Sequence, residues 1–279
     1  MFKFPDPRTK DPRERKVQRI LEVIPGSLTW FTLVGMIVLS ALKPIWVAIF
    51  IITFDIYWLF RTIFIAYYSV VAYFRFREGK KIDWWERCQN IENPKKYAQM
   101  LSERIETFRQ NMKEIRSFSK RRKIRKEIKK MRVFLKEVED IGSSGTEILD
   151  WRKIIHVVLL PTANEGAEII EPAIQAIADS NFPKQQMIIL LATEEREEES
   201  QRLEKVNYLQ NKFKGVFKDF LVTTHEVAPG ELKCKASNAA YAARKLMKYL
   251  DERNIDYKRV IFSNFDCDSV CHPQYFAAL

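Results

Sequence analysis

The chain has 279 residues, 47% of them hydrophobic, and its 47 Lys and Arg against 36 Asp and Glu give a net charge of +11. This hydrophobic content excludes a wholly disordered chain, and eight Gly exclude a collagen-like repeat. Four scattered Cys do not make a disulfide framework, which favours a reducing compartment. Residues 1–150 carry 30 Lys and Arg against 18 Asp and Glu, whereas residues 151–279 carry 17 against 18. The basic excess lies entirely in the first half, so the two halves are chemically different bodies.

Two long apolar segments occur in the first half. Residues 23–42 are 20 consecutive uncharged residues, enough for a helix of about 30 Å, the thickness of a bilayer's hydrocarbon core. Lys43 interrupts this run before a Pro, and a second segment covers about residues 45–66. The pattern predicts a transmembrane helical hairpin over 23–74, whose second helix is long or continues along the interface. A soluble core helix and a cleaved signal peptide are the alternatives that this length and these flanks disfavour.

Basic residues flank both predicted spans on the same side. The basic N-terminus, residues 1–22, holds seven Lys and Arg, four more follow the second span at 75–81, and Lys43 alone lies between the spans. The positive-inside rule then predicts an integral protein of the plasma or inner membrane with both termini in the cytoplasm. The downstream domain would be cytoplasmic too.

Asp55 is the acid inside the predicted spans. An intramembrane carboxylate can mark a pathway or a pairing. The alternative is that Asp55 and Arg61 both lie near a membrane face, with Tyr57 and Trp58 as interfacial anchors. The sequence favours the second interpretation.

Residues 75–150 form a basic linker that is rich in helix-forming residues. Apolar residues recur in it at roughly helical spacing, with Lys and Arg between them: Ile115, Phe118, Ile124, Ile128, Met131, Phe134 and Leu135. Three interpretations stay open: an amphipathic helix on anionic lipid, a solvated helical pair on its own domain, and a nucleic-acid contact through residues 120–130. Membrane lipids are the expected partner, and nucleic acid is not.

Strand and helix alternate four times in residues 151–279. Continuous β-branched and aliphatic runs predict buried strands at 154–161, 187–193, 217–225 and 259–265. Helical stretches separate them at about 166–179, 198–214 and 236–252. This alternation predicts an α/β domain with a mainly parallel, Rossmann-like sheet. His156 falls inside the first strand, where we expect a packed core residue.

Polar residues follow the predicted strands, at the edge where parallel sheets bind ligands. They are Pro161, Asn164 and Glu165 after the first strand, Glu194 and Glu195 after the second, and Asp266 and Asp268 after the fourth. The last two stand at i and i+2 after an apolar strand. Such oxygen ligands suit Mg²⁺ or Mn²⁺, which bind substrate phosphates through one or two carboxylates. An Asp-x-Asp triplet in an ordinary surface turn is the alternative.

These motifs resemble the donor-binding half of a family 2 glycosyltransferase, a GT-A fold that transfers a sugar from a nucleotide diphosphate. The family's Pro-x-x-Asn-Glu is similar to 161–165, its Lys-Ala-x-x-x-Asn element resembles 233–238 at the outer Lys and Asn, and its Asp-x-Asp matches 266–268. The resemblance covers about 110 residues. The hairpin before them is also similar to membrane members of the family, which act on polysaccharides and glycolipids at the cytoplasmic face.

The resemblance implies a role for each matched residue. Pro161, Asn164 and Glu165 would line the nucleotide pocket, Lys233 and Asn238 would meet the pyrophosphate or ribose, Asp266 would face the ribose and sugar, and Asp268 would bind the metal. The family usually has an Asp after the second strand to hold the base, and this chain has Glu194 and Glu195 there. The implied partners are a nucleotide-diphosphate sugar, a glycan or lipid acceptor, and Mg²⁺ or Mn²⁺.

The chain stops 11 residues after Asp268, where the family continues into an acceptor-binding half with a general base. We therefore expect a fragment or one half of a split enzyme, with a partial GT-A domain and an acceptor half on a separate chain. The rival functions are a catalytically incomplete protein that only binds donor or scaffolds, and a membrane protein that binds nucleic acid.

Overall fold

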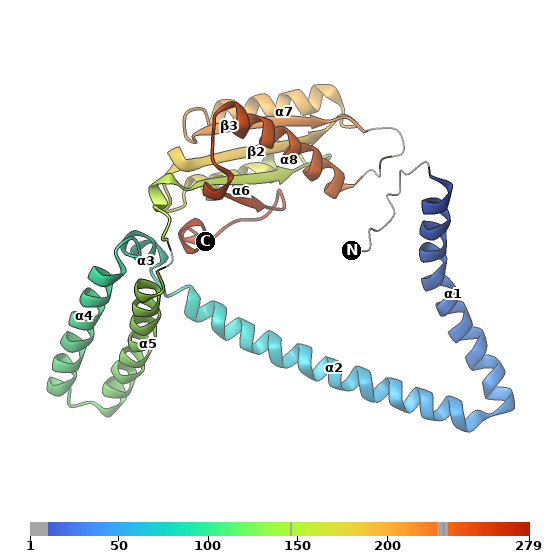
Figure 1. The fold of residues 1–279 in the computed structure, drawn as a ribbon, viewed down its shortest axis with the longest axis horizontal. Helices are drawn as coiled ribbons and strands as arrows, with labels where there is room; N and C mark the ends of the chain where they lie inside the picture. The colour runs from blue at the N-terminus through green and yellow to red at the C-terminus, as the bar shows by residue number, and fades with distance from the viewer. Residues whose placement is uncertain (1–10, 146, 228–230, 232–233) are drawn as a thin grey trace. The chain divides into compact units, whose positions relative to one another are not determined.

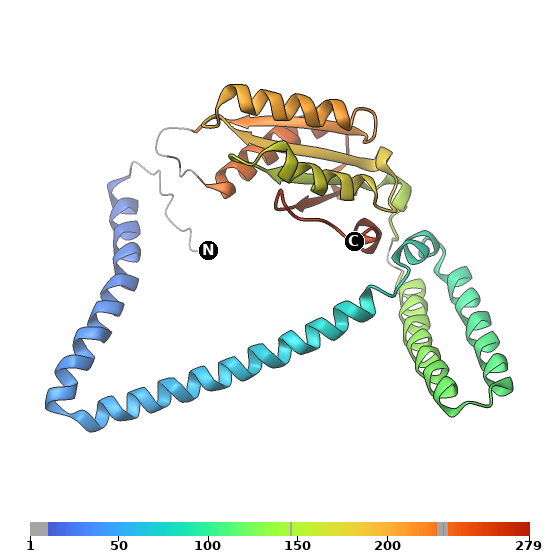
Figure 2. The ribbon, with the colours of Figure 1, turned by 180° about the vertical axis from the view of Figure 1, so that it is seen from behind.

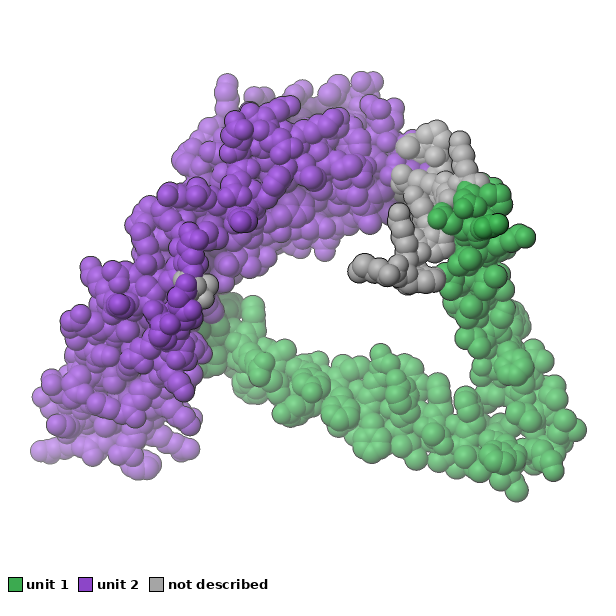
Figure 3. Space-filling view, in the orientation of Figure 1, with its two compact units in different colours: residues 1–82 green, residues 83–279 purple. Residues whose placement is uncertain are grey.

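The computed structural model describes residues 11–145, 147–227, 231 and 234–279. The chain divides into two compact units, residues 1–82 and residues 83–279 (Figure 3). The boundaries predicted from the sequence at residues 22, 74 and 150 remain predictions.

Sixteen helical and strand segments follow one another along the described chain (Figure 1). The α-helices are α1 (Pro12–Leu42), α2 (Pro44–Gly79), α3 (Trp84–Asn90), α4 (Pro94–Glu114), α5 (Phe118–Ser143), α6 (Ala167–Ala178), α7 (Glu199–Lys212), α8 (Lys235–Glu252) and α9 (Tyr275–Ala278). The strands are β1 (Ile155–Pro161), β2 (Met187–Glu194), β3 (Asp219–His225) and β4 (Val260–Asn264). Short 3-10 turns precede three of the strands, at η1 (Trp151–Lys153), η2 (Lys184–Gln186) and η3 (Tyr257–Arg259).

Helices α1 and α2 make up most of the first unit. Asp11 caps α1 by accepting a hydrogen bond of 2.8 Å from the backbone N–H of Arg13. The helix ends at Leu42 because Pro44 disfavours helical geometry at Lys43 and cannot donate a backbone hydrogen bond. Helix α2 then runs without a break for 36 residues, about 54 Å at 1.5 Å per residue, so the second helix is the long one that the sequence predicts.

The apolar side chains of α1 and α2 lie on the surface of the unit. No described residue of either helix is buried, and Phe31, Ile37 and Ile45 are each more than 70% exposed. Both helices are long and apolar enough to cross a membrane by length and composition. Within α2, Arg61 donates a 3.0 Å hydrogen bond to the Tyr57 hydroxyl and lies 5.2 Å from the centre of the Trp58 ring.

Helices α4 and α5 form a helical pair, which we call the hairpin (Figure 1). Tyr97 and Leu101 of α4 are buried against Val138 of α5, and the rings of Tyr97 and Phe134 lie 5.7 Å apart, edge to face. Phe134 and Leu135, part of the apolar periodicity read from the sequence, therefore pack inside the hairpin. Their packing between α4 and α5 fits the interpretation of this linker as a helical pair.

The four strands form one parallel sheet in the order β3-β2-β1-β4. All eight residues of β2 are buried, as the continuous apolar run in the sequence predicts for a strand covered on both faces. The predicted parallel α/β architecture is therefore confirmed.

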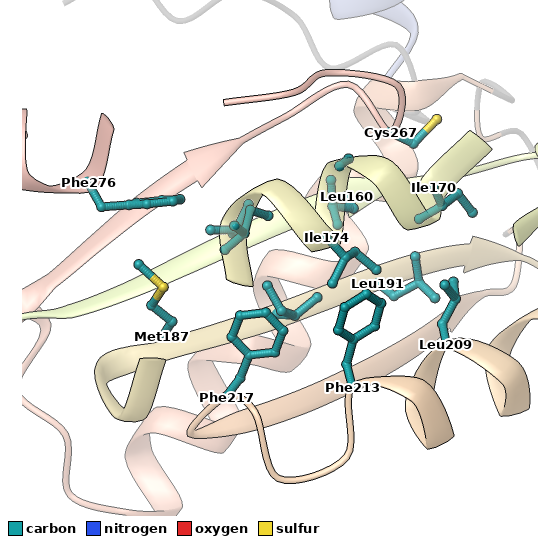
Figure 4. Close-up of a cluster of buried hydrophobic side chains, with 14 of the residues drawn as sticks. Leu160, Ile170, Ile174, Met187, Leu191, Leu209, Phe213, Phe217, Cys267 and Phe276 are labelled. Atoms are coloured by element: carbon teal, nitrogen blue, oxygen red, sulfur yellow. The ribbon is translucent and has the colours of Figure 1, made fainter. Parts of the chain in front are cut away.

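Each face of the sheet has its own layer of helices (Figures 1 and 2). Side chains alternate along a strand, so Leu160 and Ile189 pack with α6 and α7, whereas Leu159 and Leu190 pack with α8. The larger cluster, drawn in Figure 4, includes Ile170, Ile174, Leu191, Leu209, Phe213 and Phe217. These two layers cover both faces of the sheet and leave its carboxyl edge open for polar side chains.

His156 lies in β1 among aromatic rings. It is 1% exposed, and its ring centre is 4.6 Å from that of Phe182 and 5.2 Å from that of Phe276. Burial lowers the pKa of His156 to about 4, so the imidazole is neutral at pH 7. The prediction of a packed core histidine is confirmed.

Helix α3 connects the start of the second unit to its last residues. The backbone N–H of Trp84 donates a 2.6 Å hydrogen bond to the side-chain oxygen of Gln274. The Trp85 ring packs edge to face on Trp151 and Phe182, with centres 5.0 and 5.9 Å apart. These contacts join the segment before the hairpin to the same core that supports the sheet.

Candidate functional site

The carboxyl ends of three adjacent strands meet at one edge of the sheet. Register pairs Pro161 of β1 with Ala192 of β2, and Leu159 of β1 with Asn264 of β4. The residues that follow these strands therefore lie together, although more than 100 positions separate Pro161 from Asp266 in the chain. This is the edge at which parallel α/β sheets bind ligands.

A cavity of about 410 Å³ opens at this edge. The predicted site residues that line it are Pro161, Glu165, Glu194, Asn238, Asp266 and Asp268. Four further polar or thiol side chains line it that the sequence interpretation did not select: Thr162, Arg196, Lys235 and Cys267. Six of the nine residues selected from the sequence thus border a single cavity.

The Asp-x-Asp triplet alternates between solvent and core. Asp266 and Asp268 are exposed, whereas Cys267 between them is 7% exposed and belongs to the buried cluster of Figure 4. Burial raises the pKa of the Cys267 thiol, and the negative charges of Glu165 and Asp268 raise it further. The neutral thiol anchors the segment, and both carboxylates face outward to the cavity.

Lys235, the first residue of α8, forms an ion pair with Asp266. Both side chains are about half exposed or more, so water screens the pair. The ammonium lies where a cation bound by Asp266 would also lie. The signal for Lys235 in the sequence is weak: it stands two positions after the Lys233 that was matched to the family motif.

Asn238 is buried in the first turn of α8 and joins the loop after β1 to strand β2. Its amide nitrogen donates to the backbone oxygens of Ala192 and Thr162, at 2.9 and 3.2 Å. Within the described part of the chain, its amide oxygen is buried without a hydrogen-bond partner. Asn238 therefore joins the loop after β1 to the end of β2, and its buried amide oxygen retains an unused acceptor within the described part of the chain.

Glu165 turns back on its own loop. One of its carboxylate oxygens accepts a 2.6 Å hydrogen bond from the backbone N–H of Ala163. Partial burial opposes ionisation, but this hydrogen bond and the charge of Lys205 hold the pKa of Glu165 below its usual value. Glu165 is thus a carboxylate at neutral pH.

The two glutamates after β2 have different surroundings. The Glu194 side chain is 3% exposed, lines the cavity and pairs with Arg196. Glu195 is exposed, and its backbone N–H donates to the carbonyl of His225 at 3.1 Å. Glu194 is therefore the one of the two that the structure brings to the other candidate residues.

Asn164 lines a neighbouring cavity of about 480 Å³ between the starts of α6 and α7, and Glu165 lines both cavities. Most of the polar residues around this second cavity are glutamates, including Glu168, Glu171 and Glu197. Lys233, selected from the sequence, lies outside the described residues.

Within the described part of the chain, no three His, Cys, Asp or Glu side chains form a cluster that could hold a metal ion by themselves. Mg²⁺ does not require such a cluster, because it keeps several waters and uses one or two carboxylates together with substrate phosphates. The exposed oxygens of Asp266 and Asp268 at the cavity fit that donor set.

No family model and no curated protein matches the chain. Among solved structures, the crystal structure of TarS from S. aureus is similar to part of it, with 17% sequence identity and a TM-score of 0.28. The matched region covers 41% of this chain and 17% of TarS, so the chain spans less than a fifth of that protein's length. At this TM-score the likeness says nothing about the activity of this chain.

Proposed function

We propose that this chain is the donor-binding part of a membrane-bound glycosyltransferase, which transfers a sugar from a nucleotide-diphosphate sugar to a glycan or lipid acceptor. The observation that carries the proposal is the single cavity at the carboxyl edge of the sheet. Three separate motifs of the family resemblance meet there: Pro161 and Glu165, Asn238, and the Asp266–Asp268 pair. The strand order brings the residues after β1, β2 and β4 to this edge, and Asn238 of α8 joins them at the same cavity.

Asp266 and Asp268 would hold Mg²⁺ or Mn²⁺. When bound, such an ion stabilises the negative charge that develops on the diphosphate leaving group. Lys235 would add a second positive charge at the same edge, and Asn238 would hold the loop after β1 against strand β2. Glu165 and Glu194, which line the same cavity, would contact the nucleoside.

Donor binding without turnover is the second candidate function. The observation that favours it is that both glutamates at the cavity are already engaged by other groups. Glu165 accepts a hydrogen bond from a backbone N–H, and Glu194 pairs with Arg196. The two aspartates are assigned to the metal. A general base for the acceptor hydroxyl is therefore not assigned among the described residues that line the cavity, and we propose that a separate acceptor-binding half supplies it.

Helices α1 and α2 would anchor the protein in the membrane. Their exposed apolar surfaces and their lengths support this, and the excess of Lys and Arg on the outer flanks supports a cytoplasmic position for both termini and for the α/β part. A nucleotide sugar made in the cytoplasm would reach the cavity from that side.

Turnover by the full chain in nanodiscs separates the two candidates. If the chain turns over donor, we expect hydrolysis of a radiolabelled nucleotide-diphosphate sugar, with water in place of the acceptor, that requires Mn²⁺ and falls at least about 100-fold in Asp268→Asn. Asp140→Asn, which changes an exposed aspartate of α5 in the same way, is the matched control. Mn²⁺-dependent binding without turnover would leave the second candidate, and turnover that is unchanged in Asp268→Asn would contradict the assignment of the metal ligands.

A further inference from the structure

The end of the hairpin carries a concentrated positive charge. We define the basic tip as residues 113–132, the end of α4 and the first half of α5, which hold 11 Lys and Arg against two acids, Glu114 and Glu127. The rest of α5, residues 133–143, holds one Lys and three acids. With two acids for 11 cations, most of the charge in the tip cannot be neutralised within it.

The turn at the tip is held in place by one of these cations. The Arg121 side chain donates to the backbone oxygens of Ile115 and Lys113, at 2.5 and 3.3 Å, and so caps the end of α4. Arg121 is half-buried, whereas neighbouring cations such as Lys120 and Lys123 are exposed. Arg121 therefore stabilises the turn, and the neighbouring Lys and Arg side chains expose their charge to solvent.

An exposed aromatic ring stands at the apex. Phe118 begins α5 and is 78% exposed, although α4 and α5 bury other apolar side chains, such as Ile105 and Ile128, against each other farther from the turn. An aromatic ring surrounded by Lys and Arg matches the chemistry of a bilayer surface, where the ring enters the interface and the cations meet anionic headgroups. Nucleic acid would also attract the charge, and bases of a single strand can stack on an exposed ring. The two long apolar helices that precede the hairpin in the chain favour the bilayer.

We propose that the basic tip docks on the surface of a bilayer that contains anionic lipid. The inference rests on the membrane anchoring of the proposed function, because the hairpin follows α2 in the chain after a short connection and α3. Basic segments next to membrane helices bind anionic headgroups, with an effect of about fivefold per cation. Docking at the tip would add a second attachment to the membrane besides α1 and α2.

Lipid quenching of a new tryptophan tests the proposal. The full chain with Phe118→Trp is placed in nanodiscs of brominated phosphatidylglycerol or brominated phosphatidylcholine, and the emission of the unsubstituted chain is subtracted. We expect the added emission to be quenched at least about twofold more in phosphatidylglycerol. The difference should vanish in K120Q/K123Q/K126Q/K129Q, and it should persist in the control K214Q/K218Q/K248Q/K258Q, which removes the same charge elsewhere on the second unit.

Equal quenching in the two lipids would overturn the proposal. If the chain also bound a labelled single-stranded RNA with a steep salt dependence that the tip variant abolished, nucleic acid would be the partner instead. Extraction of membranes with alkaline carbonate tests anchoring separately. If the chain were released, sedimentation with phosphatidylglycerol vesicles would test the tip alone, and Asp268→Asn should change neither result.

Discussion

The ammonium of Lys235 lies against a carboxylate that we assign to a divalent cation. Two positive charges then share Asp266, and each lowers the affinity of the other. We predict that Lys235→Ala raises the affinity for Mn²⁺ in the absence of nucleotide by about five- to tenfold. Titration followed by the paramagnetic resonance of free Mn²⁺ measures this. Lys248→Ala, on an exposed position of the same helix, should have no effect, and an unchanged or weaker affinity in Lys235→Ala would contradict the assignment of Asp266.

The second prediction at the scale of the residue concerns the contribution of Asn238 to the stability of the fold. Asn238→Ala leaves the carbonyl of Thr162 without its side-chain donor and weakens the bonding at Ala192. We expect the free energy of unfolding to fall by about 1–3 kcal/mol, the cost of unsatisfied buried polar groups. Denaturant titration monitored by intrinsic fluorescence measures it, with the exposed Asn211→Ala as the control. Equal destabilisation by both variants would show that Asn238 does not join the loop after β1 to β2.

Individual site residues could be predicted from the sequence only in part. Strand ends are visible in the sequence, because a buried parallel strand is a continuous apolar run followed by polar residues. This suffices for Pro161 and Asp266. It does not distinguish Glu194 from Glu195, because the direction of a side chain after a strand ends depends on how the loop turns. The pairing of Lys235 with Asp266 depends on where α8 begins, which sequence patterns locate only to within a few residues.

At the scale of the element, β1 contains a titratable group with a strongly shifted pKa. His156 has a pKa of about 4 in the folded chain, against about 6.5 when unfolded. The unfolded state therefore binds the proton first, so the stability contributed by neutral His156 is complete above pH 6.5 and is lost as the pH falls towards 4. We predict a loss of about 3 kcal/mol over this interval.

His156→Leu is the matched variant, because leucine keeps most of the volume between Phe182 and Phe276 and does not titrate. Its free energy of unfolding should decrease less than that of the unsubstituted chain between pH 7 and pH 4. Parallel pH profiles for the two proteins, measured by denaturant titration, would mean that burial does not suppress protonation at this position.

The secondary-structure elements themselves could be predicted well. The four strands of the sheet begin and end within two residues of the predicted limits, because their apolar runs are uninterrupted and turn residues bound them. The hairpin was harder to predict. The apolar periodicity from Ile115 to Leu135 fits a helix that lies on lipid and also a helix that packs on another helix. The partners that decide between these two arrangements, Tyr97 and Leu101, lie in a different segment of the chain.

At the scale of the whole molecule, the charge distribution predicts an orientation. Lys43 would lie outside the cell and the α/β part inside. A hydrogen bond from the backbone N–H of Ser237 lowers the pKa of the exposed Cys234 thiol, which makes it a reactive internal marker. A membrane-impermeant maleimide should label Lys43→Cys in intact cells and Cys234 only after lysis. Labelling of Cys234 in intact cells would show the opposite orientation and contradict this prediction.

The account depends most on the claim that Asp266 and Asp268 hold a metal ion against a nucleoside diphosphate. Calorimetric titration of the full chain with UDP, GDP, ADP and CDP, with and without Mn²⁺, tests this most directly. We predict that at least one nucleotide binds, that its affinity falls at least about tenfold without Mn²⁺, and that Asp268→Asn causes the same loss while Asp140→Asn does not. Equal affinity with and without the metal, or in Asp268→Asn, would contradict the account.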